Sequence, residues 1–159
     1  MGKVIVKLGD DISTDVIYPG RYMATVLPSE TPQFAFADMT DFNGALRGGR
    51  VPAGSVIVAG KNFGCGSSRE QAALALREAG VSAVIAPSFA RIFFRNAINV
   101  GLPAIECSLS CTGGENVRFD LADGWVETGG IQYPVRPLSP RMREILIAGG
   151  LVNYWRARR

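Results

Sequence analysis

The sequence contains no histidine among its 159 residues. Histidine is the commonest general base and the commonest metal ligand in proteins. A serine or cysteine nucleophile activated by a histidine of the same chain is therefore excluded. Any acid–base chemistry that this chain performs must use other side chains.

Cysteines and long apolar runs are also scarce. The three cysteines, Cys65, Cys107 and Cys111, match neither a disulfide framework nor a CxxC metal site in number or spacing. No apolar run approaches the roughly 20 residues that cross a bilayer. The N-terminus leads directly into a short apolar run at 4–6 and lacks the pattern of a signal peptide. We therefore expect a cytoplasmic protein with no membrane partner.

The charge balance excludes another class of partner. The chain has 17 Lys and Arg against 14 Asp and Glu, which gives a net charge of +3, and Arg156, Arg158 and Arg159 lie at the extreme C-terminus. Nucleic-acid-binding proteins concentrate basic residues along one helix or face, so we expect no nucleic-acid partner. The length and the 47% apolar content predict a single domain over residues 1–159.

The hydrophobic pattern predicts an α/β fold. Strands are expected at 4–8, 55–58, 83–85 and 102–105, and helices at about 68–79 and 88–99. This alternation is typical of βαβ units with a parallel sheet. Later short strands at 117–121, 125–127 and 131–135 predict a β-meander. A last helix is expected to begin at Ser139-Pro140 and to end at Gly149-Gly150.

The segments between these elements are less regular. Residues 12–20 are interpreted as a loop that carries side chains inward, and a short helix is expected at about 31–39. A mobile connection is expected near 43–54, because glycines and prolines interrupt that stretch.

The turn at 62–71 carries the strongest local signal. Asn62-Phe-Gly-Cys-Gly-Ser-Ser-Arg-Glu-Gln71 joins a buried strand to a helix. One interpretation is structural, since Ser67 with Glu70, or Ser68 with Gln71, would form a capping box. The other is an anion site, in which helix N–H groups and Arg69 would stabilise the alkoxide of Ser67. A nucleophilic Cys65 is less favoured, because no partner base is available.

Two further segments carry charged side chains that are candidate site residues. Asp15 stands beside Val16-Ile17 and is expected to be drawn inward to an arginine or serine, as a structural ion pair or as a site residue. Arg91 and Arg95 lie one turn apart in the helix for which Ser88 is the expected cap. They could orient a substrate carboxylate or Asp15, although solvated arginines are commoner.

Three motifs, in this order and spacing, strongly resemble the small subunits of isopropylmalate dehydratase and homoaconitase, in the aconitase superfamily. They are Gly9-Asp10-Asp11-x-x-Thr14-Asp15-x-Ile17-x-Pro19-x-Arg21-Tyr22, Gly60-Lys-Asn-Phe-Gly-Cys-Gly-Ser-Ser-Arg-Glu70, and Ala86-Pro-Ser-Phe-Ala-Arg-Ile-Phe93. The resemblance implies a swivelling β/β/α domain like the aconitase C-terminal domain. It also implies a large partner subunit, in a heterodimer or heterotetramer, that holds a [4Fe–4S] cluster which this chain does not bind.

The resemblance also implies roles for individual residues. Ser67 corresponds to the catalytic base, Asp15 to an assisting aspartate, and Ser68 and Arg69 to substrate-binding residues, whereas Arg91 corresponds to a conformational residue. The implied reaction is the dehydration of a hydroxy-diacid to an alkene, followed by rehydration at the neighbouring carbon.

Specificity is implied by the residues after Arg21-Tyr22. Met23, Ala24 and Thr25 correspond to positions that face the variable substituent of the malate, where homoaconitase-like subunits place an arginine at the position of Ala24. Ala24 therefore favours an apolar substituent, as in isopropylmalate or dimethylmalate. Gln71 stands where many relatives carry histidine, and 34–50 matches no family pattern. Outside enzymology, the alternative is a stand-alone anion-binding module built on 67–69.

Overall fold

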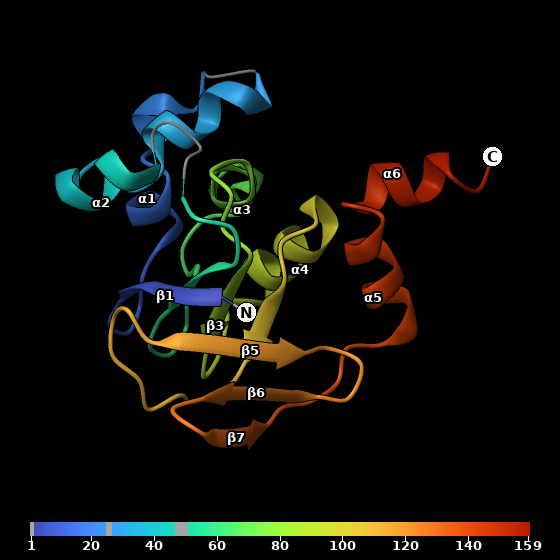
Figure 1. The fold of residues 1–159 in the computed structure, drawn as a ribbon. Helices are drawn as coiled ribbons and strands as arrows, with labels where there is room; N and C mark the ends of the chain where they lie inside the picture. Colours follow the sequence, from blue (N-terminus) through green and yellow to red (C-terminus); the bar gives the residue numbers. More distant parts are fainter. Residues whose placement is uncertain (1, 25–26, 47–50) are drawn as a thin grey trace.

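The computed structural model describes residues 2–24, 27–46 and 51–159, and within these ranges one seven-stranded sheet organises the chain (Figure 1). The strand order is β4-β3-β2-β1-β5-β6-β7. The strands are β1 (Gly2–Lys7), β2 (Ser55–Val58), β3 (Ala83–Ala86), β4 (Ala104–Glu106), β5 (Asn116–Asp120), β6 (Trp125–Thr128) and β7 (Ile131–Pro134). All seven coincide with predicted strands to within a few residues.

The first half of the sheet is parallel. β1, β2, β3 and β4 pair in parallel, and every residue of β2 and β3 is buried. The helices α3 (Glu70–Glu78) and α4 (Arg91–Val100) connect these strands and pack on one face of the sheet. Strands that are apolar on both faces are typical of such βαβ units. The α/β prediction is therefore confirmed.

The second half is antiparallel and continues the same sheet. β5 pairs with β1, and β5, β6 and β7 form the predicted meander. Val117 and Val126 of the meander share a buried cluster with Val56, Val58 and Ile85, whose side chains point away from the helices. The meander thus closes over the face that the helices leave open. The mixed sheet with helices and a meander is the predicted architecture.

Several short helices were not predicted. Residues 12–20, expected as a loop, contain α1 (Thr14–Ile17), and a 3-10 turn, η1 (Gly20–Tyr22), begins after Pro19. The expected helix at 31–39 is instead a 3-10 helix, η2 (Pro28–Phe34), because Pro32 lies inside it and cannot donate a helical hydrogen bond. The next helix, α2 (Thr40–Leu46), begins within the stretch that carried no helical prediction.

The prediction of a mobile connection at 43–54 is wrong for the first residues of that range. Asn43 is buried, and its side-chain amide donates to the backbone carbonyls of Gln33 and Ala35 at 2.9 and 2.8 Å. These two bonds fasten α2 to the preceding segment. Residues 47–50 lie outside the described part of the chain.

The C-terminal region packs beside α4 (Figure 1). Ser139 caps α5 (Pro140–Ile147) by accepting from the backbone N–H of Met142 at 3.2 Å, as predicted. Gly149 and Gly150 end α5 in positive-φ conformations, also as predicted. A second helix, α6 (Leu151–Arg156), follows with Gly150 as its N-cap residue, and the sequence analysis did not predict it.

Candidate active site

The loops at the carboxyl ends of β1 and β2 are joined by backbone hydrogen bonds. Gly64 donates to the carbonyl of Ile12 at 2.7 Å, and Thr14 donates to the carbonyl of Cys65 at 2.8 Å. The loop after β3 also meets them, since Phe63 donates to the carbonyl of Ser88 at 3.1 Å and accepts from the backbone N–H of Ala90 at 2.9 Å. In open α/β sheets, ligands bind at the carboxyl edge of the strands, and this edge holds the predicted site.

The turn at 62–67 depends on glycine. Gly64 adopts φ of +81°, and a Cβ built there would lie 2.2 Å from Cγ of Phe93. Phe93 is buried and packs edge-on against Phe63, with ring centroids 5.1 Å apart. The turn therefore lies directly against the aromatic core.

We expect Gly64→Ala to lower the free energy of unfolding by about 3 kcal/mol, because it combines a disfavoured positive φ with overpacking against Phe93. Urea denaturation of the chain would measure this loss. Gly113→Ala is the matched control, since a Cβ placed on Gly113 would meet nothing within 4 Å and its φ is not positive. Equal stability of the two variants would contradict the predicted clash.

Ser67 is exposed and does not cap a helix. The N-cap residue of α3 is Arg69, with no side-chain cap, so both predicted capping boxes are wrong. The hydrogen bonds between 64–65 and 12–14 hold the loop extended and delay the start of the helix. The Ser67 hydroxyl instead lies 3.2 Å from the hydroxyl of Thr14. Ser68 is also exposed, and its carbonyl accepts from the Asn96 side chain at 3.3 Å.

Arg69 and Asp15 form the charged pair of the site. Nη1 of Arg69 lies 2.8 Å from Oδ1 of Asp15, and that same oxygen accepts from the backbone N–H of Gly20 at 2.9 Å. The prediction of an arginine partner is confirmed. The predicted inward burial is wrong, because Asp15 lies on the solvent side of α1 and its side chain is 69% exposed. The Gly20 N–H, and then Arg69, lower the pKa of Asp15 below its ordinary value of 3.8.

Arg69 is fixed on one side and open on the other. Its Nη1 also donates to the carbonyl of Tyr18 at 3.3 Å, and its side chain is 22% exposed. Within the described residues, both hydrogen bonds of this guanidinium use Nη1. Its remaining N–H groups are therefore free to bind a carboxylate in the planar, two-pronged geometry that arginine favours.

The predicted specificity segment follows η1, whose first residue, Gly20, donates its N–H to Asp15. Met23 and Ala24 follow η1 and are exposed, whereas Thr25 lies outside the described residues. Tyr22 stacks on Phe34 with ring centroids 4.2 Å apart, and its carbonyl accepts from the hydroxyl of Tyr18 at 3.1 Å. This packing holds the start of the segment in place relative to Arg69.

The two arginines of α4 lie elsewhere. Ala90 is the N-cap residue of α4, and the hydroxyl of Ser88 accepts from the backbone N–H of Asn62 at 2.8 Å, so the predicted Ser88 cap is wrong. Arg91 and Arg95 are exposed and line a groove between α4 and α5. The guanidinium that orients Asp15 is that of Arg69.

The cysteines do not gather at the site. Cys107 and Cys111 are buried on the meander side of the sheet, and burial raises the pKa of both thiols. Cys65 is partly exposed in the site loop. No group of three or more Cys, Asp or Glu side chains in the described ranges could hold a metal ion. The described residues of this chain therefore do not fit a [4Fe–4S] cluster.

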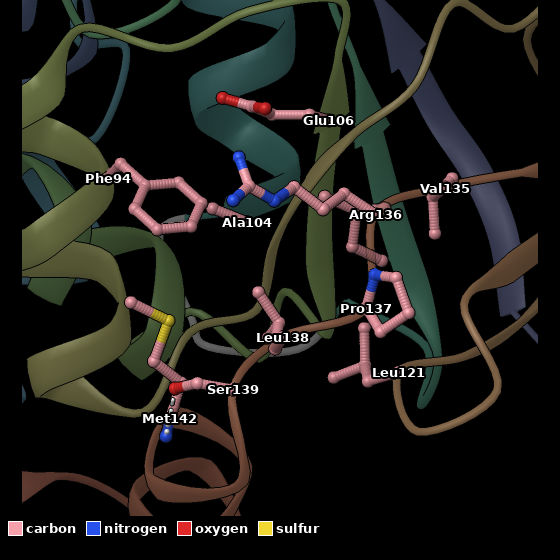
Figure 2. Close-up of a pocket in the computed structure, with 11 residues that line it drawn as sticks. Phe94, Ala104, Glu106, Leu121, Val135, Arg136, Pro137, Leu138, Ser139 and Met142 are labelled. Carbon is pink, nitrogen blue, oxygen red and sulfur yellow. Dashed lines mark hydrogen bonds between the residues drawn. The ribbon is translucent and has the colours of Figure 1, made fainter.

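A cavity of about 420 Å³ contains none of the predicted site residues (Figure 2). It lies between β4, the segment 135–139 and the helices α4 and α5. Figure 2 shows mostly apolar side chains around it, with Glu106 and Arg136 as the charged members. The predicted site residues lie at the carboxyl edge instead, where the Ser67 hydroxyl and the Arg69–Asp15 pair are held on neighbouring loops.

Sequence reasoning missed Thr14, Tyr18 and Gly20 as parts of the site. Thr14 is named in the quoted motifs, whereas Tyr18 and Gly20 stand at unspecified positions of the first motif. The partners of Thr14 and Tyr18 are more than 50 residues away in the chain. Only the fold brings them to Ser67 and Arg69.

The fold and this edge define a class of protein. The family model of the aconitase C-terminal domain matches residues 29–109, and the chain belongs to this family. No helix in the described residues is long and apolar enough to span a membrane.

Particular relatives are similar over nearly the whole chain. The 3-isopropylmalate dehydratase small subunit of Moorella thermoacetica is 48% identical, over 92% of this chain and 89% of its own length. The methanogen homoaconitase small subunit of Methanothermobacter thermautotrophicus is 44% identical, over 94% of this chain and 86% of its own length. A crystal structure of 3-isopropylmalate dehydratase from Methanocaldococcus jannaschii matches with a TM-score of 0.87 and 44% identity. The match covers 99% of this chain and 93% of that one.

Proposed function

We propose that this chain is the small subunit of a hydro-lyase that interconverts 2-isopropylmalate and 3-isopropylmalate, a step of leucine biosynthesis. The observation that carries the proposal is the exposed Ser67 hydroxyl, which caps no helix and shares the carboxyl edge of the sheet with the Arg69–Asp15 pair. The relatives named above support the substrate class. We regard residues 1–159 as one swivelling domain.

Ser67 acts as the base in this proposal. As an alkoxide it takes a proton from the carbon next to the hydroxyl-bearing carbon. The C–H electron pair becomes the C=C bond, and the hydroxyl leaves as water with a proton taken from solvent. In the second half of the reaction, the oxygen of water bonds to the neighbouring carbon and releases one proton to solvent, while Ser67 returns its proton to the other carbon. Arg69 and Ser68 hold a substrate carboxylate, and Asp15 keeps the Arg69 guanidinium in its orientation.

The rest of the site belongs to a partner. We place a [4Fe–4S] cluster on a large subunit, where it would act as a Lewis acid toward the leaving hydroxyl. Exposed apolar side chains near the edge, Val16, Met23 and Ile92, give such a partner a surface to cover. The assembly would be a heterodimer or heterotetramer. The three free thiols are in keeping with the reducing cytoplasm.

Turnover of a set of substrates tests this proposal. The chain would be combined anaerobically with the large subunit of its own organism, iron and sulfide, and the alkene intermediate followed by absorbance. We expect turnover of 2- and 3-isopropylmalate above that of dimethylmalate, homocitrate and citrate. Tight dicarboxylate binding by this chain alone, with no turnover by the pair, would favour an anion-binding module instead.

Homoaconitase is the second candidate, since one relative carries that name. The exposed Ala24 distinguishes the two, because it offers no charge to a third carboxylate. We expect Ala24→Arg to raise kcat/KM for homocitrate relative to isopropylmalate by about tenfold or more, the size expected for one charge-assisted hydrogen bond. Ala24→Gln is the control for side-chain bulk without charge. An unchanged ratio in Ala24→Arg would contradict this assignment of Ala24.

A further inference from the structure

Thr14 presents a buried hydroxyl to Ser67. The side chain of Thr14 belongs to a residue only 2% exposed, and its Oγ1 lies 3.2 Å from Oγ of Ser67. The same Oγ1 accepts the backbone N–H of Ser67 at 3.2 Å. Thr14 thus contacts both the backbone and the side chain of Ser67, a residue 53 positions away.

Backbone hydrogen bonds between the loop of Thr14 and the loop of Ser67 hold this contact. The N–H of Thr14 donates to the carbonyl of Cys65 at 2.8 Å, and Ser13 and Cys65 form a β-bridge. Gly66, directly before Ser67, adopts φ of +99°, a backbone conformation that favours glycine. The glycine therefore permits the turn that places Ser67 against the threonine.

The direction of the hydrogen bond depends on the state of Ser67. When both hydroxyls are neutral, either can donate. When Ser67 is ionised it has no proton, and the bond persists only if Thr14 donates. A hydrogen bond to the charged form lowers the pKa of a group, and such a bond is strongest where the donor is buried.

We propose that Thr14 is a positioning residue, whose hydroxyl orients the side chain of Ser67 and donates to its alkoxide. This inference rests on the proposed role of Ser67 as the base. Arg69 and the helix N–H groups are the donors that the sequence indicated. Thr14 adds a further hydrogen-bond donor to Ser67, which does not contact substrate and is already in place before substrate binds.

The test compares Thr14→Val, which keeps the shape and removes the hydroxyl, with Thr14→Ser, which keeps the hydroxyl. In the complex with the large subunit, we expect Thr14→Val to lower kcat roughly 10- to 100-fold, as for a hydrogen bond to a charged group. KM should change little, because Thr14 does not touch substrate. Thr14→Ser should retain most of the activity.

The pH profile separates this role from a purely structural one. We expect the ascending limb of kcat in Thr14→Val to move up by about one to two pH units. The other charged or titratable groups on the elements that meet here are unchanged in the variant, so a moved limb reports on Ser67. These groups are Asp10, Asp11, Asp15, Tyr18, Arg21, Tyr22, Lys61, Cys65, Arg69, Glu70, Arg91 and Arg95.

A double-mutant cycle completes the test. Thr14→Val should have no further effect in a Ser67→Ala background. Normal kcat in Thr14→Val, an unmoved pH limb, or an equal loss in the Ser67→Ala background would overturn the inference. If Thr14→Val does not assemble, Thr14→Ala is measured in the same way. An inactive wild-type complex, or a fully active Ser67→Ala complex, would instead count against the proposed function.

Discussion

Replacing Ser67 by alanine is expected to lower kcat of the assembled enzyme by about 10²- to 10⁴-fold, the usual contribution of a positioned base. KM should stay within a few-fold, because the hydroxyl acts on a C–H bond and the carboxylates are held elsewhere. Steady-state kinetics on 2-isopropylmalate with the reconstituted complex would measure both. The variant should fold normally, since the Ser67 side chain is exposed and caps no helix.

The matched control is Ser108→Ala, another exposed serine, which lies outside the site loops. It should leave kcat and KM unchanged. Near-normal kcat in Ser67→Ala, with the complex intact by size-exclusion chromatography, would contradict the role of Ser67 as the base.

Replacing Arg69 by lysine is expected to cause the second large loss of activity in the assembled enzyme. Lysine keeps the positive charge but cannot bind Asp15 and a carboxylate in one plane. We expect kcat/KM to fall about 100-fold, with most of the loss in KM, because charge-assisted hydrogen bonds to the substrate are lost.

Arg118→Lys serves as the comparison for Arg69→Lys. Arg118 pairs with Glu127 across β5 and β6 at 2.6 Å, on the exposed meander, and its replacement should leave kinetics unchanged. If Arg69→Lys raised KM no more than Arg118→Lys did, Arg69 would not bind a substrate carboxylate.

The sheet was predictable because each strand carries its own signal. β2 and β3 are short apolar runs bounded by turn residues, and α3 and α4 show clear helical spacing. The short helices at 14–46 were not predictable, since they depend on tertiary contacts such as those of Asn43 with the carbonyls around η2.

The site was predictable only in part. The motifs contain Ser67, Arg69 and Asp15, and the sequence indicated an arginine partner for Asp15. It did not reveal that Asp15 is exposed, because its apolar neighbours in the sequence do not define the buried face of a four-residue helix. The capping boxes were wrong because loop-to-loop hydrogen bonds, invisible in a local pattern, move the start of α3 to Glu70.

The most direct test of the account is to titrate this chain into a fixed amount of the cluster-loaded large subunit and to record turnover of isopropylmalate at each ratio. Because we place the base on this chain, turnover should be absent without it and should saturate when each large subunit has a partner. The Ser67→Ala chain should saturate binding at the same ratio while turnover stays near background. Full turnover by the large subunit alone would contradict the central claim that this chain supplies the base.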